Sequence, residues 1–284
     1  MTGVANGSCA VEFNPGHITL PGNFSADPGT AGSTTLLLQI SLPLLLFSPS
    51  RTPTPTPSTL TLRGGTNATL APQIDYTQHV FLPFIKRHFG VTGVGLDLRR
   101  RGYFPRGGGE VAVSVLPVGE GGRLRSLQLL ERGDVRVVRG IAHVGGLPAH
   151  LGREMEEGAR RWLGRAGYGV PAIGSAPGGN PDLNASVPIE IEVKRERNED
   201  VFGGGSGIVL WAELEGGGLI GGSAVGRKGV DAGSVGEEAA EDLMRGLEGG
   251  GCVDEWLQDQ IIIFMALAEG RSRVRCAGLT LHTK

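Results

Sequence analysis

Glycine is the residue that most constrains this chain, because it occupies 49 of the 284 positions. That share is well above the roughly 7% of an average protein. The glycines stand mostly between short apolar runs, and they follow no three-residue repeat of the kind that forms collagen. This distribution predicts many short helices and strands that are joined by tight turns.

Strand-like and helix-like segments alternate along the chain. Strands are predicted at residues 11–20, 60–62, 93–99, 110–118, 135–144, 189–193, 208–214 and 219–225. Helices are predicted at residues 31–47, 75–89, 149–166, 234–247 and from residue 253 onward. Two segments, 48–59 and 175–185, are rich in proline, serine, glycine or threonine and predict loops. The alternation predicts an α/β or α+β fold, in which a second unit begins near residue 131.

Charge and composition exclude several classes of protein. The formal net charge is −2, which argues against a protein that coats nucleic acid but allows one that binds only the end of a strand. Cys9, Cys252 and Cys276 lack the spacing of a metal site or a disulfide framework. Residues 1–10 do not resemble a signal peptide, and the apolar run 36–47 is too short to span a bilayer. We therefore expect an intracellular protein without a membrane segment.

Three motifs could bind phosphate, and each has a structural alternative. Gly107–Gly109 would expose backbone N–H groups to an anion, or would form a plain turn between two strands. No Gly-Lys-Ser/Thr follows it, so it is not a nucleotide-binding P-loop. Arg99–Arg101, with Arg106, would contact phosphate through planar guanidinium groups, or would form a solvated edge. Gly226–Gly229 is a basic turn that could also contact phosphate.

The segment from Val253 to Lys284 joins a polar helix start, an apolar run and a histidine. Asp259 and Gln260 can face a ligand from the predicted helix, and a returning strand can bring His282 toward them. Imidazole is a nucleophile near neutral pH, so this group suits phosphoryl or nucleotidyl transfer. A single histidine is more often structural than catalytic, so these residues alone leave both roles of His282 open.

Seven segments, read together, resemble the RNA 3′-terminal phosphate cyclase family in order and approximate spacing. They are DPGTAGSTTLLLQ (27–39), GGTN (64–67), APQIDY (71–76), RGYFPRGGGEV (101–111), GRKGV (226–230), VDEWLQDQ (253–260) and LTLHT (279–283). Together they extend over nearly the whole chain. The resemblance implies a large domain of repeated helix–sheet units at residues 1–130 and 252–284. It also implies a smaller α/β insert domain at residues 131–251.

The resemblance implies that the protein uses ATP to convert an RNA 3′-terminal phosphate into a 2′,3′-cyclic phosphodiester. Nε2 of His282 would attack the α-phosphate of ATP and would hold AMP as a phosphoramidate. The residues that match the family's nucleotide-contacting positions are Gln39, Pro72, Trp256, Asp259 and Gln260. Trp256 stands where the family usually has tyrosine, so it keeps an aromatic face but loses a hydroxyl. The implied cofactors are ATP and a divalent metal, Mg²⁺ or Mn²⁺, without an assigned protein ligand for the metal.

The implied partners are RNA 3′-phosphate ends, without DNA or a membrane, and the implied location is the nucleus. The family opens with a glycine-rich strand and an arginine-rich segment, and this sequence begins after both. It also ends two residues beyond His282, where the family continues. Two other functions therefore stay open: a non-catalytic cyclase-like protein in ribosome assembly, and an inactive truncated cyclase. The presence of His282 with Asp259 and Gln260 favours the cyclase branch, while the oligomeric state and the RNA target stay open.

Overall fold

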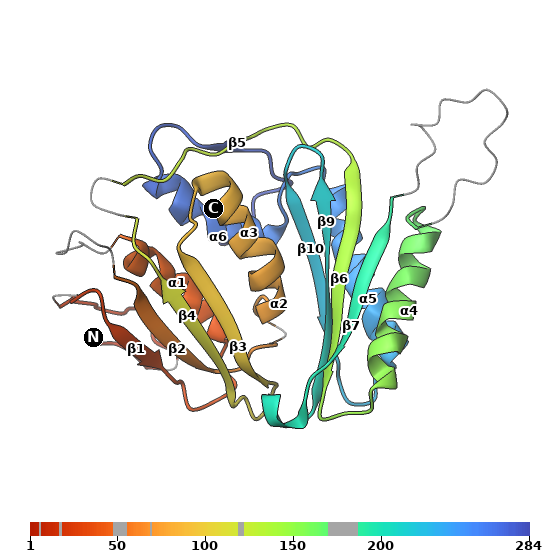
Figure 1. The fold of residues 1–284 in the computed structure, drawn as a ribbon. Coiled ribbons are helices and arrows are strands. Elements are labelled where there is room, and N and C mark those ends of the chain that lie inside the picture. Colours follow the sequence, from red (N-terminus) through yellow and green to blue (C-terminus); the bar gives the residue numbers. More distant parts are fainter. Residues whose placement is uncertain (6, 17–18, 48–55, 69, 119–121, 170–186) are drawn as a thin grey trace.

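Two sheets stand next to each other in the fold, with helices between them and on their outer faces (Figure 1). This computed structural model describes residues 1–5, 7–16, 19–47, 56–68, 70–118, 122–169 and 187–284. Helices and mixed sheets alternate along the chain, which confirms the predicted α/β class. The proposed division at residues 131 and 251 stays a prediction.

The first sheet has five strands in the order β1, β2, β4, β3, β8. Their bounds are β1 Asn23–Ala26, β2 Ser58–Gly64, β3 Val94–Gly102, β4 Gly109–Val115 and β8 Val201–Phe202. The central strands β2, β4 and β3 are antiparallel, whereas β1 is parallel to β2 and β8 is parallel to β3. Side chains on β2 alternate between buried and exposed, as expected for a sheet with one face on a core.

Three helical segments pack on this sheet and on one another. The first is α1 Thr34–Leu46, and the last is α6 Glu255–Leu267. The second is one continuous stretch that consists of α2 Ile74–Tyr76, the π-helical η1 Thr77–Phe81 and α3 Leu82–Phe89. The Ser33 hydroxyl accepts a hydrogen bond from the Leu36 N–H and so caps α1, which explains where this helix begins. None of the described helices is both long enough and apolar enough to cross a bilayer.

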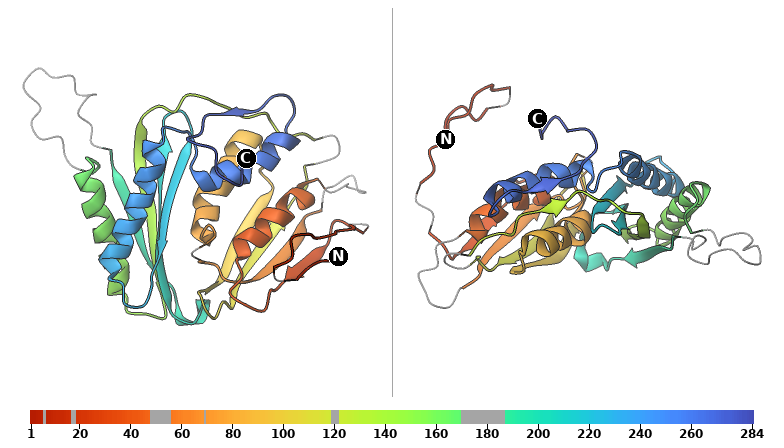
Figure 2. Two further views of the ribbon diagram at one scale, coloured as in Figure 1. Left: turned by 180° about the vertical axis from the view of Figure 1, so that it is seen from behind. Right: turned by 90° about the horizontal axis from the view of Figure 1, so that it is seen from above.

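The second sheet has four strands in the order β10, β9, β6, β7. Their bounds are β6 Val135–Gly145, β7 Ile189–Arg195, β9 Gly205–Leu214 and β10 Leu219–Val225. The helices α4 His150–Arg165 and α5 Ala232–Glu248 cover its outer face (Figure 2). Val209 and Trp211 belong to the core shared with the first sheet, whereas Ile208 and Leu210 belong to the core under α4 and α5. The alternation along β9 therefore buries both faces of this sheet.

A short parallel pair, β5 Gln128–Leu129 and β11 Arg273–Val274, joins two segments that are far apart in the sequence. Arg123 forms an ion pair with Glu269 beside this pair. The pair therefore holds the chain that enters the second sheet next to the chain that follows α6.

The predicted helices and the longer predicted strands are confirmed, but one strand prediction is wrong. Among the described residues of segment 11–20, only Glu12 makes a bridge, to Thr2, and β1 instead begins at Asn23. Residues 48–55 and 175–185, which were predicted as loops, lie outside the described residues, and Ser58 already belongs to β2. The two-residue strands β5, β8 and β11 were not predicted, because so short a segment carries no periodicity.

Candidate active site

Helix α6 carries three of the residues that were predicted to bind the nucleotide. Trp256, Asp259 and Gln260 are three and four positions apart, so they lie on neighbouring parts of the helix surface. Trp256 and Asp259 are half-buried, whereas Gln260 is buried. The helix therefore presents an aromatic ring and a carboxylate at its surface, with an amide behind them.

Asp254 fixes where α6 begins. Its carboxylate accepts hydrogen bonds from the backbone N–H of Leu257 at 2.9 Å and of Gly221 at 2.7 Å. It also accepts one from the Tyr76 hydroxyl, at 2.8 Å. Burial raises the pKa of Asp254 to about 6, although these hydrogen bonds favour the ionised form. This carboxylate anchors the first turn of α6, and with it Trp256, to both β10 and α2.

Helix α1 brings Gln39 to α6. The Gln260 Nε2 group donates a hydrogen bond of 3.4 Å to Oε1 of Gln39. Gln260 is only 3% exposed, and its own Oε1 atom has no hydrogen-bond partner among the described residues. A buried amide oxygen without a partner costs about 1–3 kcal/mol. This oxygen could accept a hydrogen bond only if a donor moved next to it.

Gln258 holds the segment that leads to His282 against α6. Its amide donates a hydrogen bond of 3.2 Å to the Gly278 carbonyl and accepts one of 2.9 Å from the Thr280 N–H. The Thr280 hydroxyl then accepts a hydrogen bond of 3.1 Å from the Thr283 N–H, which closes a turn around His282. The prediction of a returning strand is wrong, because His282 lies in this turn. The sequence analysis did not predict Gln258. The feature that could have identified it is an amide side chain among apolar residues of the helix, because a buried amide needs hydrogen-bond partners.

A cavity of about 320 Å³ lies where α1, α6 and this turn meet. We call it the nucleotide cavity, after the residues predicted to contact a nucleotide, and its lining residues are Leu36, Gln39, Leu70, Glu255, Trp256, Asp259, Thr280 and His282. It brings together four of the six predicted site residues, which come from opposite ends of the sequence. His282 is exposed and reaches the cavity edge. A histidine, an aromatic face and polar side chains thus line one cavity.

Two predicted residues lie behind the cavity wall and do not line the cavity. Gln260 is buried next to Gln39, as described above. Pro72 is also buried, and its carbonyl accepts a hydrogen bond of 2.8 Å from the Thr35 hydroxyl in the first turn of α1. Leu70 lines the cavity close to Pro72 in the sequence. In this structure Pro72 therefore ties its segment to α1.

Within the arginine run 99–101, Arg101 is not available to a phosphate. Arg101 is 1% exposed, and its guanidinium donates two hydrogen bonds of 2.7 Å to Asp75 and one of 2.7 Å to Glu196. Arg99 forms ion pairs with Asp97 and Glu110. The phosphate interpretation of Arg101 is wrong, because buried carboxylates already occupy its donors.

The glycines at 107–109 form the turn that connects β3 to β4. Gly107 and Gly108 have φ angles of +63° and +68°, which favour glycine, and the Gly107 N–H donates to the Tyr103 carbonyl. A side chain at Gly108 would meet the ring of Phe202. The turn geometry and this packing explain the glycines without a ligand.

Arg101 belongs to a buried group that we call the polar joint, formed by Asn67, Gln73, Asp75, Arg101, Tyr103, His143 and Glu196. His143 contacts Asn67 and Gln73 through Nε2, at 3.1 and 3.2 Å, and the Tyr103 hydroxyl through Nδ1, at 2.9 Å. Gln73 also donates to the Ala224 carbonyl of β10 at 3.1 Å. The joint therefore links the first sheet, α2 and the second sheet.

Two groups of the polar joint have shifted pKa values. Burial, together with the Arg101 guanidinium, lowers the pKa of His143 to about 3, so this imidazole is neutral at physiological pH. Burial alone would raise the pKa of Asp75, but Arg101 and its hydrogen bonds hold that pKa well below its usual range. The joint thus contains a permanent ion pair beside a neutral histidine.

Comparison with known proteins gives one consistent result. The family model for RNA 3′-terminal phosphate cyclase matches residues 1–284. An RNA 3′-terminal phosphate cyclase of Pyrobaculum aerophilum is 38% identical over 282 residues, which cover 99% of this chain and 72% of that protein. The protein of the same name from Drosophila melanogaster is 36% identical over 280 residues, which cover 98% of this chain and 69% of that protein. The similarity thus extends over nearly all of this chain.

Proposed function

Because the chain belongs to the RNA 3′-terminal phosphate cyclase family, we propose that it converts RNA 3′-phosphate ends into 2′,3′-cyclic phosphodiesters with ATP. The single observation that carries the proposal is the nucleotide cavity, where His282 meets Gln39, Trp256 and Asp259. A nucleophilic imidazole beside an aromatic ring and polar groups suits transfer of a nucleotidyl group.

In the first step, Nε2 of His282 would attack the α-phosphorus of ATP. A P–N bond forms and the bond from the α-phosphorus to the bridging oxygen breaks, so pyrophosphate leaves and AMP stays on the histidine. Neutral imidazole has the lone pair that this attack requires, and His282 is exposed at the cavity edge.

In the second step, an oxygen of the RNA 3′-phosphate would attack the phosphorus of the bound AMP. The P–N bond breaks, the imidazole is released, and the RNA ends in a phosphoanhydride to AMP. The neighbouring 2′-hydroxyl then attacks the RNA phosphorus, AMP leaves, and the hydroxyl proton passes to solvent or a base. The products are the cyclic end and AMP.

The lining of the nucleotide cavity fits an adenylate. The half-buried Trp256 ring offers a face on which a base can stack, and such stacking contributes about 1–3 kcal/mol. Asp259 can accept hydrogen bonds from hydroxyl or amino groups. The unpartnered Oε1 of Gln260 lies behind this wall and would gain a donor if the ligand or the amide moved toward it.

A divalent metal would neutralise charge on the phosphates. In the part of the chain that the structure describes, no group of three or more His, Cys, Asp or Glu side chains could hold a metal ion. If Mg²⁺ or Mn²⁺ takes part, we expect it to arrive with the triphosphate, since these ions commonly bind through substrate phosphates.

The test is incubation of the protein with α-labelled ATP, followed by quenching in acid or in base. A histidine phosphoramidate is labile in acid and stable in base. We expect the wild-type protein to retain a base-stable, acid-labile label. The His282→Ala variant should lose at least about a thousand-fold in labelling rate, about 4 kcal/mol. His150→Ala is the matched control, because His150 is an exposed histidine at the start of α4.

Labelling that survives in His282→Ala would contradict the proposed nucleophile. A wild-type protein that takes up no label but binds RNA would instead support the non-catalytic alternative. Cooperative unfolding of each variant, measured by circular dichroism, must accompany the assay so that an unfolded variant is not read as an inactive one.

A further inference from the structure

Two arginines near the end of β3 are not paired with an acidic side chain. Arg101 belongs to the polar joint and Arg99 forms exposed ion pairs, but no carboxylate among the described residues pairs with Arg100 or Arg106. The Nε atom of Arg100 donates a hydrogen bond of 2.8 Å to the Gly108 carbonyl. This bond fixes the guanidinium and leaves its two terminal amino groups for another acceptor.

Two exposed aromatic rings stand beside these arginines. Phe104, in the turn between β3 and β4, is 79% exposed, and Phe202 of β8 is 44% exposed. The Arg100 guanidinium lies 5.7 Å from the centre of the Phe202 ring. A side chain at Gly203 would meet the stem of Arg106, so this arginine lies next to the same strand. We call Arg100, Phe104, Arg106 and Phe202 the aromatic–arginine patch.

The patch stands on a rigid base at the lower end of the first sheet (Figure 1). Tyr103 is buried, and its hydroxyl group is hydrogen-bonded to His143 of the polar joint. The Gly107 N–H donates to the Tyr103 carbonyl and closes the turn, so Phe104 and Arg106 project from a fixed loop. An exposed ring beside unpaired cations suits single-stranded nucleic acid, because bases stack on the ring and phosphates contact the arginines.

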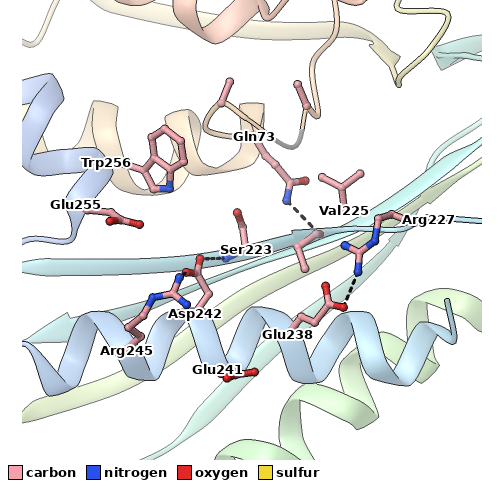
Figure 3. Close-up of a pocket in the computed structure, with 13 residues that line it drawn as sticks. Gln73, Ser223, Val225, Arg227, Glu238, Glu241, Asp242, Arg245, Glu255 and Trp256 are labelled. Carbon is pink, nitrogen blue, oxygen red and sulfur yellow. Dashed lines mark hydrogen bonds and ion pairs between the residues drawn. The ribbon is translucent and has the colours of Figure 1, made fainter. Parts of the chain in front are cut away.

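The arginines on the other side of the site differ, because each is already paired. They line a cavity of about 400 Å³ along α5. Arg227 pairs with Glu238 and Arg245 pairs with Asp242, as Figure 3 shows, and two further glutamates line the same cavity. Carboxylates repel phosphate, so this cavity does not suit an RNA backbone.

The second step of the proposed reaction requires the RNA to approach from the side opposite His282. There the imidazole leaves the phosphorus, and the attacking oxygen lies roughly in line with it on the opposite side. Gln258 contacts the turn with His282, whereas Gln260, two positions later, contacts Gln39 of α1. Positions two apart point to different sides of a helix, so α1 and that turn lie on either side of α6. The acceptor must therefore come from the side of α1.

The chain that leads into α1 connects the nucleotide cavity to the patch. Leu36, in the first turn of α1, lines the cavity. A side chain at Gly107 would meet the backbone of Thr30 and Ala31, so the β3–β4 turn packs directly on this chain. The five residues from Ala31 to Leu36 span at most about 18 Å. A strand that leaves the cavity on the side of α1 thus reaches the patch within a few nucleotides.

We propose that the aromatic–arginine patch binds the single-stranded RNA that precedes the 3′-end, with Arg100 and Arg106 on backbone phosphates and Phe104 stacked on a base. This assignment rests on the proposed function, because it follows the strand whose 3′-phosphate meets AMP at His282. Contacts to phosphates and to the face of a base require no particular sequence. A local pair of cations is also compatible with the net charge of −2.

The test compares two fluorescent oligoribonucleotides that end in the same sequence and a 3′-phosphate: a dinucleotide and a dodecanucleotide. We expect the wild-type protein to bind the longer one about tenfold more tightly, because only that one reaches the patch. Phe104→Ala and Arg106→Met should each weaken binding of the longer one about fivefold and leave the dinucleotide unaffected. Arg245→Met is the matched control, because its arginine is paired with Asp242 in the cavity along α5.

The salt dependence provides a second readout for Arg106. The slope of log affinity against log salt concentration should fall by about 0.7 in Arg106→Met, because one phosphate contact is lost. The slope for Phe104→Ala should stay at the wild-type value, because stacking involves no phosphate. Circular dichroism must show that each variant unfolds cooperatively.

Labelling with α-labelled ATP in the absence of RNA separates this assignment from the proposed function, and both variants should label at the wild-type rate. If the wild-type protein takes up no AMP but Phe104 and Arg106 still favour the longer RNA, the proposed function fails and the patch assignment stands. Equal binding of the two oligonucleotides by the wild type would overturn the assignment. So would an Arg245→Met variant that loses as much affinity as Arg106→Met, or an oligoglutamate peptide that displaces the longer RNA as well as unlabelled RNA does.

Discussion

The polar joint and the nucleotide cavity use similar residues for opposite purposes. Both contain a histidine, carboxylates and at least one amide side chain, and both lie where segments distant in the sequence meet. In the joint, His143 and Arg101 are buried and their donors meet acceptors in the protein. At the cavity, His282 is exposed, and behind the cavity wall the buried Gln260 keeps an oxygen without a partner among the described residues.

The difference shows which polar clusters can act on a ligand. A closed network stabilises one arrangement of the protein and has no free group to offer. A cluster in which a polar atom has no partner can still form a hydrogen bond with a ligand, and that bond contributes to binding. Variants in the two regions should therefore separate stability from activity, and the following predictions run from the largest effect to the smallest.

Arg101→Met should give the largest loss of stability. It leaves the Asp75 and Glu196 carboxylates buried without their cation, and breaking a buried ion pair in this way costs about 3–5 kcal/mol. Urea unfolding at pH 7 measures the change in the free energy of unfolding. Arg99→Met, which breaks only exposed pairs, should cost at most about 1 kcal/mol. If both variants lose the same free energy of unfolding, the polar joint stabilises the protein no more than an exposed ion pair does.

His143→Gln should change how stability depends on pH. The folded pKa of His143, about 3, lies below its ordinary value of 6.5, so between these values the unfolded state binds the extra proton. The contribution of His143 to the free energy of unfolding therefore decreases as pH falls from 6.5 toward 3, by up to about 1.4 kcal/mol per pH unit. Asp254 acts in the opposite direction, because its folded pKa of about 6 lies above the ordinary 3.8 and protonation favours the fold.

The two opposed contributions, from His143 and Asp254, should nearly cancel each other between pH 6 and 4. The His143→Gln variant keeps only the contribution of Asp254. Its free energy of unfolding should therefore rise relative to that of the wild type as pH falls. Urea unfolding of both proteins at pH 6, 5 and 4 isolates His143, since all other groups are common to both. Parallel curves would exclude a buried neutral histidine.

Gln258→Leu should lower the rate of AMP uptake about tenfold, or about 1.4 kcal/mol, without removing the nucleophile. The variant loses the two hydrogen bonds that hold Gly278 and Thr280, so the turn with His282 samples more positions. The matched measurement is the rate of labelling at saturating ATP, because a looser turn should lower kcat more than it raises KM. Gln258→Glu keeps the acceptor for the Thr280 N–H and should recover part of the rate. A variant that labels at the wild-type rate would show that the turn needs no support from α6.

Trp256→Tyr should have the smallest effect, within about threefold in KM for ATP. Both side chains offer an aromatic face to the base, and the change restores the residue that is usual in the family. Trp256→Ala removes the face and should weaken ATP binding by about 1–3 kcal/mol. Isothermal titration with ATP distinguishes them. If both variants bind ATP like the wild type, then Trp256 does not contact the base.

The sequence was a good guide to regular elements and to residues on one helix. The apolar periodicity of residues 75–89 predicted a helix, and the spacing of Trp256, Asp259 and Gln260 placed them on one helix of the site. It gave no sign that residues 77–81 form a π-helical turn within that helix. Hydrophobic periodicity describes one helix or strand at a time, so it could not predict how the elements pack against one another.

The residues whose surroundings the sequence did not predict share that cause. Arg101 belongs to a run of three arginines, and only its partners, 26 and 95 residues away in the sequence, show that it is buried. Pro72 matches a family position, but it does not line the cavity, and its carbonyl accepts a hydrogen bond from Thr35. Gln258 holds a loop whose conformation no local pattern predicts.

The bond between Gln39 and Gln260 also has a consequence for the order of folding. It joins residues that are 221 positions apart, whereas the second sheet and its helices use only residues 135–248. Contacts between distant positions form slowly, because the entropy of closing a long loop must be lost first. The second sheet should thus become ordered while α1 and α6 are still separate. A chain that has reached this stage would be protected from hydrogen exchange in the four strands of the second sheet and would still lack the nucleotide cavity.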